Sequence, residues 1–224
     1  MTLRRVPVAE DEQSTLYRML TWRTIPGKRV NLGCGLRHLQ HVINVDRLPA
    51  VEPEVVCDFD REPLPFETDS IDYVCSVNVF EHLVDLYHVV GEIWRVCKNG
   101  ALFELVVPNA FALGAFGDPT HCRFWTVESA AYLNAKTYAF NTSWYTDDRF
   151  HFTCPAGPTL IPEPGSQKIW EAVASLPRPF PEFFKRLLAN HSVGIFRYLF
   201  FRFTVVKPLP LDIESVIKVY PETL

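Results

Sequence analysis

The sequence predicts an α/β fold built on a doubly wound sheet. Five short apolar runs between residues 30 and 107 are each bounded by turn residues, and continuously apolar strands are typical of sheets that are covered on both faces. The first run leads directly into a two-glycine turn, Gly33-Cys34-Gly35, and the second run is followed by an isolated acid, Asp46. Sheets of this class bind ligands beyond the carboxyl ends of their parallel strands. These two features together predict a site for a nucleotide-type cofactor.

The composition is that of a globular chain with one large core. The chain has 224 residues, 48% of them hydrophobic, and a formal net charge of -4. This charge predicts no broad basic surface, so we expect a small-molecule substrate and no nucleic-acid partner. Six scattered cysteines without a CxxC pair indicate reduced thiols. No stretch has the length and hydrophobicity of a signal sequence or a membrane span, and we therefore expect a cytoplasmic protein without a membrane anchor.

The segment before the first strand is expected to contain a short helix. Leu16, Tyr17, Leu20 and Trp22 are weakly periodic, which predicts a helix that lies over the core or over a ligand. A turn at Pro26-Gly27 then precedes the sheet. Only about ten residues separate the glycine turn from the second strand, too few for the usual crossover helix, so the first connection must be a turn or a short helix.

The central part of the chain predicts five strands and one long amphipathic helix. The strands are expected at residues 30–32, 42–45, 55–57, 71–76 and 102–107. Between the last two, apolar residues from Leu83 to Cys97 recur at helical spacing. Asn99-Gly100 is expected to end this helix with a left-handed cap. The two strands that flank such a helix are parallel in nearly all proteins.

Beyond Pro108 the pattern changes to loops and shorter elements. Asp118-Pro119-Thr120-His121 follows two glycines in a loop, and Thr126 is expected to cap a helix that runs to about Ala135. The remaining expectations are strand character at 137–145 and 149–153, a loop at 155–164, a helix at 181–189 and a last strand at 201–206.

A set of motifs in the first half resembles the class I S-adenosylmethionine-dependent methyltransferases, in the type 11-like group with a shortened first crossover. The motifs are residues 30–35, 44–46, 57–59, 64–66, 70–74 and 81–83. The resemblance implies a Rossmann-like seven-stranded sheet, mostly parallel with an antiparallel last strand. It also implies a single domain over 1–224, with a cap segment at 1–27, a cofactor-binding half at 28–107 and a substrate-side half at 108–224.

The same resemblance implies S-adenosyl-L-methionine as the cofactor and direct methyl transfer to a small-molecule acceptor. Asp46 would accept hydrogen bonds from both ribose hydroxyls, with Arg47 in the same binding set. The other implied contacts are Gly33, Cys34 and Gly35 beneath the methionine end, Asp58 at the adenine amino group, Phe59 beside the ring, and Val77 and Asn78 along the methionine moiety. The cofactor carboxylate has three candidate partners: Asn31, Arg37 or an amino-terminal residue.

His121 is the candidate catalytic base. It lies in a glycine-bearing loop at the expected mouth of the site, where a histidine can take a proton from a substrate hydroxyl at neutral pH. The alternative is a histidine that bonds the loop backbone and shapes the pocket. Glu81 and His82 are adjacent, so they are expected to point in different directions, with His82 as a capping residue.

No metal site is expected from histidine spacing. His38 and His41 are three residues apart and His82 and His88 six apart, without a carboxylate partner at ligand spacing. Two other functions stay open: a non-catalytic cofactor-binding or scaffold protein, and an NAD-dependent oxidoreductase. His38 replaces the third glycine of a dinucleotide fingerprint, which counts against the oxidoreductase. The aromatic segment 195–203 is a candidate contact surface for a homo-oligomer, and the sequence does not distinguish O-, N- and C-methylation.

Overall fold

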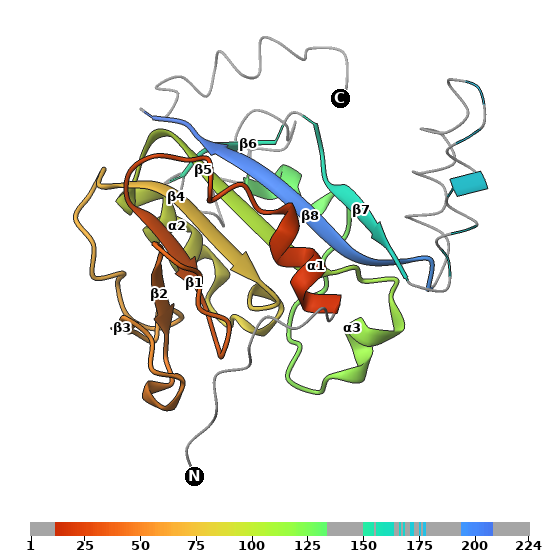
Figure 1. The fold of residues 1–224 in the computed structure, drawn as a ribbon, viewed down its shortest axis with the longest axis horizontal. Coiled ribbons are helices and arrows are strands. Elements are labelled where there is room, and N and C mark those ends of the chain that lie inside the picture. The colour runs from red at the N-terminus through yellow and green to blue at the C-terminus, as the bar shows by residue number, and fades with distance from the viewer. Residues whose placement is uncertain are drawn as a thin grey trace, which may run out of the picture.

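A mixed β-sheet organises the protein (Figure 1). The computed structural model describes residues 12–133, 150–154, 156–163 and 194–207, with six further single positions between 166 and 177. The strands are β1 (Arg29–Leu32), β2 (Ile43–Asp46), β3 (Val55–Val56), β4 (Ile71–Val77), β5 (Cys97–Pro108), β6 (Phe152–Thr153), β7 (Thr159–Pro162) and β8 (Phe196–Val205). Their order is β3-β2-β1-β4-β5-β8-β6, and β7 also pairs with β8. The five strands predicted between residues 30 and 107 are therefore confirmed.

The sheet has a parallel half and an antiparallel edge. Strands β1 to β5 pair in parallel, whereas β8 runs antiparallel to β5 along its length. The other edge of β8 pairs with β6 near Val205 and with β7 between Phe200 and Phe196. The eight strands thus occupy seven positions, because β6 and β7 share the outermost one. This agrees with the seven-stranded sheet and the antiparallel last strand that the resemblance implies.

The edge of the sheet corrects one prediction. Residues 155–164 were expected to be loop, but they contain β7, which pairs with β8. The prediction is wrong because proline is tolerated in an edge strand, where its missing N–H removes no bond from the interior of the sheet. The last strand is also longer than predicted, since β8 begins at Phe196 rather than at Phe201.

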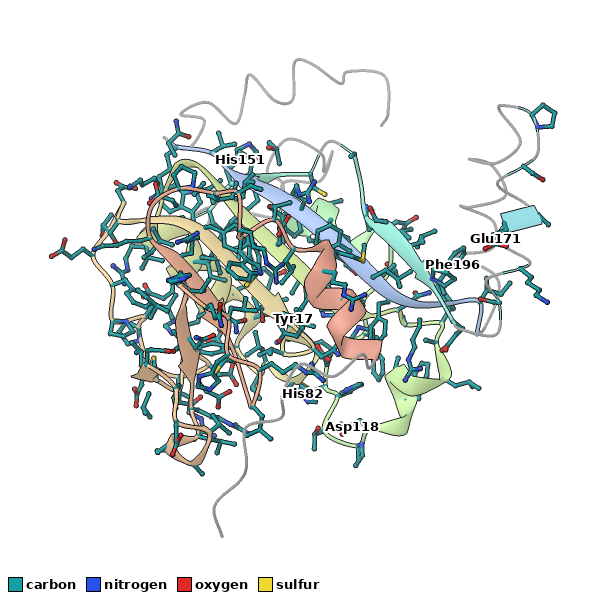
Figure 2. The ribbon with its side chains drawn as sticks, viewed as in Figure 1. Tyr17, His82, Asp118, His151, Glu171 and Phe196 are labelled. Atoms are coloured by element: carbon teal, nitrogen blue, oxygen red, sulfur yellow. The ribbon has the colours of Figure 1, made fainter. Side chains whose placement is uncertain are left out.

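Helices cover the two faces of the sheet. The long helix α2 (Leu86–Val96) packs on one face together with Val74, Phe103 and Leu105. The short helix α1 (Glu12–Met19) packs on the other face, where Tyr17 lies against a cluster that includes Tyr73 and Val106 (Figure 2). Successive side chains of a strand point to opposite faces, so α1 and α2 lie on opposite sides. The predicted doubly wound arrangement and the predicted amino-terminal helix are confirmed.

The boundaries of the long helix differ from the prediction. Asp85 caps its start, with the carboxylate accepting from the backbone N of His88 at 3.0 Å. The helix ends at Val96, and the next residue already has extended backbone. Asn99 and Gly100 belong to β5 and not to a helix cap. Gly100 does adopt a left-handed φ of 82°, so the sequence signal for this conformation was real but lies within the strand.

Other connections are short single turns. They comprise η1 (Pro49–Val51), η2 (Phe80–His82), α3 (Leu113–Gly117) and η3 (Ser129–Leu133). The predicted helix after Thr126 is the 3-10 turn η3, with the Thr126 hydroxyl accepting from the backbone N of Glu128 at 3.3 Å. The expected strand at 137–145, the expected helix at 181–189 and the end of the helix at Ala135 lie outside the described residues.

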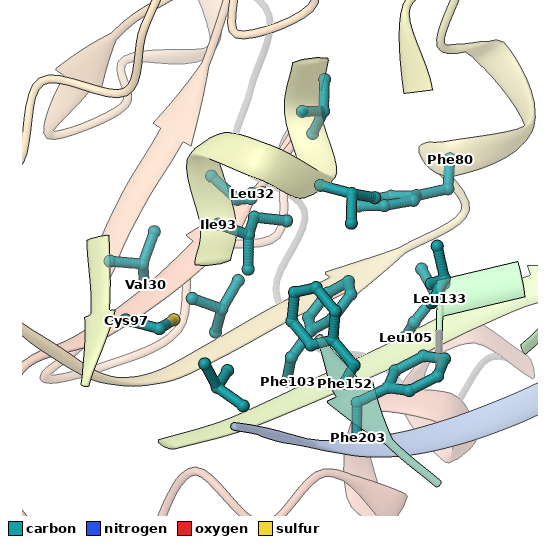
Figure 3. Close-up of a cluster of buried hydrophobic side chains, with 14 of the residues drawn as sticks. Val30, Leu32, Phe80, Ile93, Cys97, Phe103, Leu105, Leu133, Phe152 and Phe203 are labelled. Carbon is teal, nitrogen blue, oxygen red and sulfur yellow. The ribbon is translucent and has the colours of Figure 1, made fainter. Parts of the chain in front are cut away.

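An aromatic cluster beneath α2 fixes the segment that follows β4 (Figure 3). The ring of Phe103 lies 5.5 Å from that of Phe80, 6.0 Å from that of Phe152 and 5.6 Å from that of Phe203. All four side chains are fully buried. Because Phe80 is the first residue of η2, its burial anchors the turn that carries Glu81 and His82.

A buried polar network ties the amino-terminal segment to the opposite face of the sheet. The carboxylate of Glu104 is fully buried. It accepts from the hydroxyl of Tyr73 at 2.5 Å and from the backbone N of Thr21 at 2.7 Å, and it pairs with the guanidinium of Arg202 at 2.7 Å. Burial raises the pKa of Tyr73, which therefore stays a neutral donor. This network connects β4, β5, β8 and the chain just after α1.

The first connection of the sheet is formed by turns without a helix, which is one of the two forms that the sequence predicts. The side chain of Asn44 bonds the backbone of this connection. Its amide oxygen accepts from the backbone N of Leu39 at 2.9 Å, and its amide nitrogen donates to the carbonyl of Leu39 at 3.1 Å. The amide of Asn31 also donates to Asn44 at 3.0 Å. These bonds satisfy two buried amides and hold the turn against β1 and β2.

Candidate functional site

Three parallel strands bring the main predicted cofactor residues to one end of the sheet. Strand β1 lies between β2 and β4, with Leu32 opposite both Val45 and Ser76. Beyond these strands come the turn Gly33–Gly35, the carboxylate of Asp46 and the side chain of Asn78. Sheets of this class bind their ligands here, beyond the carboxyl ends of the parallel strands.

The two glycines of the turn have different tasks. Both are left-handed, with φ of 69° at Gly33 and 49° at Gly35. A Cβ at Gly33 would lie 2.4 Å from the side chain of Val79, whereas a Cβ at Gly35 would meet nothing within 4 Å. Gly33 is therefore required by close packing between two strand ends. Gly35 leaves its backbone open to a ligand.

The carboxylate of Asp46 is held in place by backbone donors. One oxygen accepts from the N of Gly35 and the other from the N of Leu48, both at 2.9 Å. The residue is only 8% exposed. A carboxylate offers about four lone-pair sites, so each oxygen can accept a further hydrogen bond. The geometry suits a ligand with two neighbouring hydroxyls.

Asn78 ends β4 with a strained backbone and an unused acceptor. Its φ is 55°, and its backbone N donates to the carbonyl of Val106 at 2.9 Å. Its side-chain oxygen is buried and has no hydrogen-bond partner within the described part of the chain. A buried unpaired acceptor is costly, and a ligand that donates at this point would remove the cost.

The remaining predicted residues are less uniform. Cys34 is 2% exposed, and burial together with the nearby Asp46 charge raises the pKa of its thiol to about 12, so it is a neutral turn residue and not a nucleophile. Phe59 packs within the core beneath α2, and Val77 within the cluster beneath α1. Asp58 is half-buried and lies 3.9 Å from the guanidinium of Arg61, and Arg47 is exposed.

One candidate for the cofactor carboxylate is excluded. Asn31 is fully buried, and its amide donates to Asn44 and to the carbonyl of Arg37 at 3.2 Å. Its side chain is thus used within the protein.

A second group of side chains gathers just after Asn78. Glu81 and His82 in η2 meet His121 from the loop after α3. The Oε1 atom of Glu81 lies 3.9 Å from Nε2 of His82 and 4.0 Å from Nε2 of His121. The two imidazole rings are T-shaped, with centroids 4.7 Å apart. The loop is held to η2 because the backbone N atoms of Cys122 and Arg123 both donate to the carbonyl of Glu81.

This group corrects the expectation that Glu81 and His82 face apart. That expectation assumes a regular helix, but η2 is a single 3-10 turn that passes into extended backbone at Leu83. The grouping with His121 was missed because its members lie on two segments that are distant in the sequence. The histidine spacings that were considered, His38 with His41 and His82 with His88, contain no signal for it.

Hydrogen bonds fix the orientation of both histidine rings. Nδ1 of His121 lies 2.8 Å from the carbonyl of Ala115, which can only accept, so this nitrogen carries the proton. Nδ1 of His82 lies 3.0 Å from the hydroxyl of Thr120, whose own proton goes to Asp118 at 2.6 Å. The hydroxyl therefore accepts from His82. In the neutral rings both Nε2 atoms keep a lone pair, and both lie within 4.0 Å of the Oε1 atom of Glu81.

Glu81 is the most deeply buried of the three. It is 1% exposed, and its Oε2 atom has no hydrogen-bond partner among the described residues. Burial raises the pKa of its carboxyl to about 8, and the negative charge of Asp118 adds to the shift. Figure 2 shows His82 and Asp118 close together at this end of the molecule.

Helix α1 packs over the face of the sheet that carries Cys75 and Val77. Burial is the main cause that raises the pKa of Tyr17, and the nearby Cys75, Cys34 and Arg37 also influence it. Tyr17 therefore lies beside the turn that carries Cys34. This position fits the expectation that the amino-terminal helix lies over the core or a ligand.

Comparisons with known proteins agree with this arrangement. The family model described as a methyltransferase domain matches residues 32–105. A SAM dependent methyltransferase from Archaeoglobus fulgidus is 15% identical, with a TM-score of 0.56 over 86% of this chain and 92% of that chain. The YcgJ protein from Bacillus subtilis is 14% identical, with a TM-score of 0.50 over 88% of this chain and 100% of that chain. No curated protein matches the chain.

Two further observations concern helix length and the cysteines. No helix among the described residues has the length and apolar character needed to cross a membrane. All six cysteines are free thiols.

Proposed function

We propose that the protein is a class I S-adenosylmethionine-dependent methyltransferase that transfers a methyl group to a small-molecule acceptor in the cytoplasm; the match of residues 32–105 to the methyltransferase-domain family supports the proposal. The observation that carries the proposal is the carboxylate of Asp46, held by the N atoms of Gly35 and Leu48 at the end of β2. Its free lone pairs suit the two hydroxyls of a ribose.

The other residues at this end of the sheet fit the cofactor as well. The open backbone at Gly35 allows close approach of the methionine end, with Gly33 and Cys34 forming the rest of the turn. The unpaired oxygen of Asn78 is an acceptor for the ammonium group. The proposal completes the set with Arg47 near the ribose, Asp58 at the adenine amino group, Phe59 beside the adenine ring, Val77 along the methionine moiety and Arg37 at the carboxylate.

S-adenosylmethionine supplies a methyl group that is already electrophilic. The chain must therefore hold the acceptor in line with that methyl and exclude water. The proposal assigns the exclusion of water to α1 and η2, whose side chains Tyr17 and Phe80 are 9% and 0% exposed.

His121 is the proposed base when the acceptor is a hydroxyl. Its Nδ1 proton is held by the carbonyl of Ala115, so Nε2 is the atom that can accept a proton. The side chain is 8% exposed, which limits competition from water. The proposed division into a cap at 1–27, a cofactor half at 28–107 and a substrate half at 108–224 places this histidine in the substrate half.

Calorimetric titration of S-adenosylhomocysteine tests the proposal. Wild-type protein should bind it stoichiometrically and should not bind NAD. Asp46→Ala should lose about 1–3 kcal/mol of binding free energy, since hydroxyl partners are left unpaired. Glu128→Gln, which replaces an exposed acid outside the proposed binding set, is the matched control and should bind as wild type.

Binding without methyl transfer to any acceptor would favour a non-catalytic scaffold of the same fold. Absence of binding in a folded wild-type protein would contradict the proposal.

A further inference from the structure

The group formed by Glu81, His82 and His121 has the composition of a metal site. Each residue offers one ligand atom, and the three atoms lie within 4.8 Å of one another. We propose that these atoms bind a divalent first-row transition-metal cation beside the proposed cofactor site.

The first argument is the convergence of lone pairs. The tautomers set by Ala115 and Thr120 leave a lone pair on Nε2 of both histidines, within 4.0 Å of the Glu81 carboxylate. All three facing atoms are then acceptors when the carboxylate is ionised. A single cation accepts a lone pair from each of the three atoms. Its positive charge also balances the negative charge of Glu81, whose Oε2 has no partner among the described residues.

The second argument is geometry. Ligand atoms that share one cation at roughly 2.0–2.2 Å lie about 3–3.5 Å apart. The separations of 3.9 and 4.0 Å from Glu81 to the two histidines exceed this by about 0.4–1 Å, and all three ligand atoms lie within 4.8 Å of one another. Small side-chain rotations close that gap.

The third argument is the support around the ligands. Metal-binding histidines usually donate their other ring nitrogen to a carbonyl or a carboxylate-linked group. His121 donates directly to a carbonyl, and His82 donates to a hydroxyl that is itself bonded to Asp118. The second carboxylate oxygen of Asp118 lies 3.8 Å from Nε2 of His121, close enough to be a further ligand after a modest shift.

The donor set selects the class of cation. Two imidazoles and one carboxylate suit zinc, iron, cobalt or manganese, whereas magnesium and calcium prefer oxygen-only sites. Three protein ligands leave coordination positions open, as in catalytic metal sites.

The consequence for catalysis rests on the proposed function. With the cation bound, the lone pair of His121 would be occupied, and the cation would lower the pKa of an acceptor hydroxyl at an open coordination position, so that its proton would pass to solvent water. The cation then replaces His121 as the means of ionising the acceptor.

Titration of cobalt(II) into metal-stripped full-length protein tests the binding directly, because bound cobalt(II) absorbs visible light in a way that depends on its ligands. One equivalent should bind to the wild type and be displaced by zinc(II). Glu81→Gln, His82→Gln and His121→Ala should each lower the affinity by about tenfold or more. His88→Gln is the control, because His88 lies on α2 with its Nε2 3.2 Å from the carbonyl of Glu62 and does not belong to the group of three ligands, so the variant should bind as wild type.

Circular dichroism establishes that each variant is folded. Because three ligand residues are replaced separately, the test still works if one of the variants does not fold. Equal cobalt spectra in wild type and all three ligand variants would overturn the proposal, as would the absence of stoichiometric binding. S-adenosylhomocysteine titrated into the same samples separates the two ideas. If the protein binds S-adenosylhomocysteine but not cobalt(II), only the metal-site proposal is contradicted. If it binds cobalt(II) but not S-adenosylhomocysteine, only the methyltransferase proposal is contradicted.

Discussion

At the scale of single residues, the strand ends combine packing and binding roles that the sequence alone does not separate. Gly33 and Gly35 form one motif, yet only at Gly33 would an added Cβ meet another side chain, that of Val79. Asn78 adopts a left-handed φ of 55°, a conformation typical of glycine, and its amide oxygen has no partner among the described residues. These differences lead to two predictions.

Gly33→Ala should lower the free energy of unfolding by about 1–3 kcal/mol, because a side chain there is strained at φ of 69° and clashes with Val79. Urea denaturation measures the change. Gly114→Ala is the control, since that glycine lies in α3 with nothing within 4 Å of an added Cβ. Equal stability of the Gly33 variant and wild type would show that the close contact is not needed.

Asn78→Gly should leave stability unchanged or raise it, since glycine adopts a φ of 55° without strain and removes a buried unpaired oxygen. Affinity for S-adenosylhomocysteine should nevertheless fall by about tenfold or more, through loss of an acceptor for a charged donor. Thermal unfolding and calorimetry on the same sample check both effects. Unchanged affinity would remove Asn78 from the binding set.

The sequence located these residues because each follows a clear strand signal. It could not group Glu81 and His82 with His121, since that grouping depends on the turn η2 and on bonds from Cys122 and Arg123 across the fold.

At the scale of elements, strand positions in the parallel half were predictable and the edges were not. Buried strands such as β4 show their apolar character directly in the sequence. Strand β7 is an edge strand that contains proline, and it owes its conformation to pairing with β8. The end of α2 at Val96 likewise depends on the pairing of Cys97 with Ile71. Tertiary contacts thus overrode local turn signals at both places.

Glu104 joins these elements, and its replacement should loosen them. Glu104→Gln should lower the free energy of unfolding by about 3 kcal/mol, because Arg202 loses its charged partner and the donors of Thr21 and Tyr73 lose an ionised acceptor. Urea denaturation is the measurement, and the exposed substitution Glu128→Gln is the control. A change below 0.5 kcal/mol, about the size of a surface substitution, would contradict a structural role for the network.

At the scale of the whole molecule, the fold brings a cofactor-type site and a group with histidines together at one end of the sheet. Asn78 and Glu81 lie in the same short connection after β4, and the loop of His121 is bonded to it. The sequence predicted the class of fold and the residues at the strand ends. The identity of the methyl acceptor depends on side chains around the site, and the strand pattern of the sequence does not reveal it.

His121→Ala should separate binding from chemistry in this arrangement. With a hydroxyl acceptor, turnover should fall by about 10²–10⁴, as expected when a proton-accepting group is lost. Affinity for S-adenosylhomocysteine should stay within about twofold of wild type, since this binding does not involve the histidine. Steady-state kinetics and calorimetry give the two values. A parallel loss of cofactor affinity would indicate that His121 shapes the binding site rather than acting on the acceptor.

The most direct test of the central claim is a crystal structure of the protein with S-adenosylhomocysteine. We expect both ribose hydroxyls within hydrogen-bond distance of the Asp46 carboxylate, the backbone of Gly35 against the homocysteine part, and the sulfur facing the side of the site that carries His121. A nucleoside bound elsewhere, or an Asp46 carboxylate that makes no contact with it, would contradict the account.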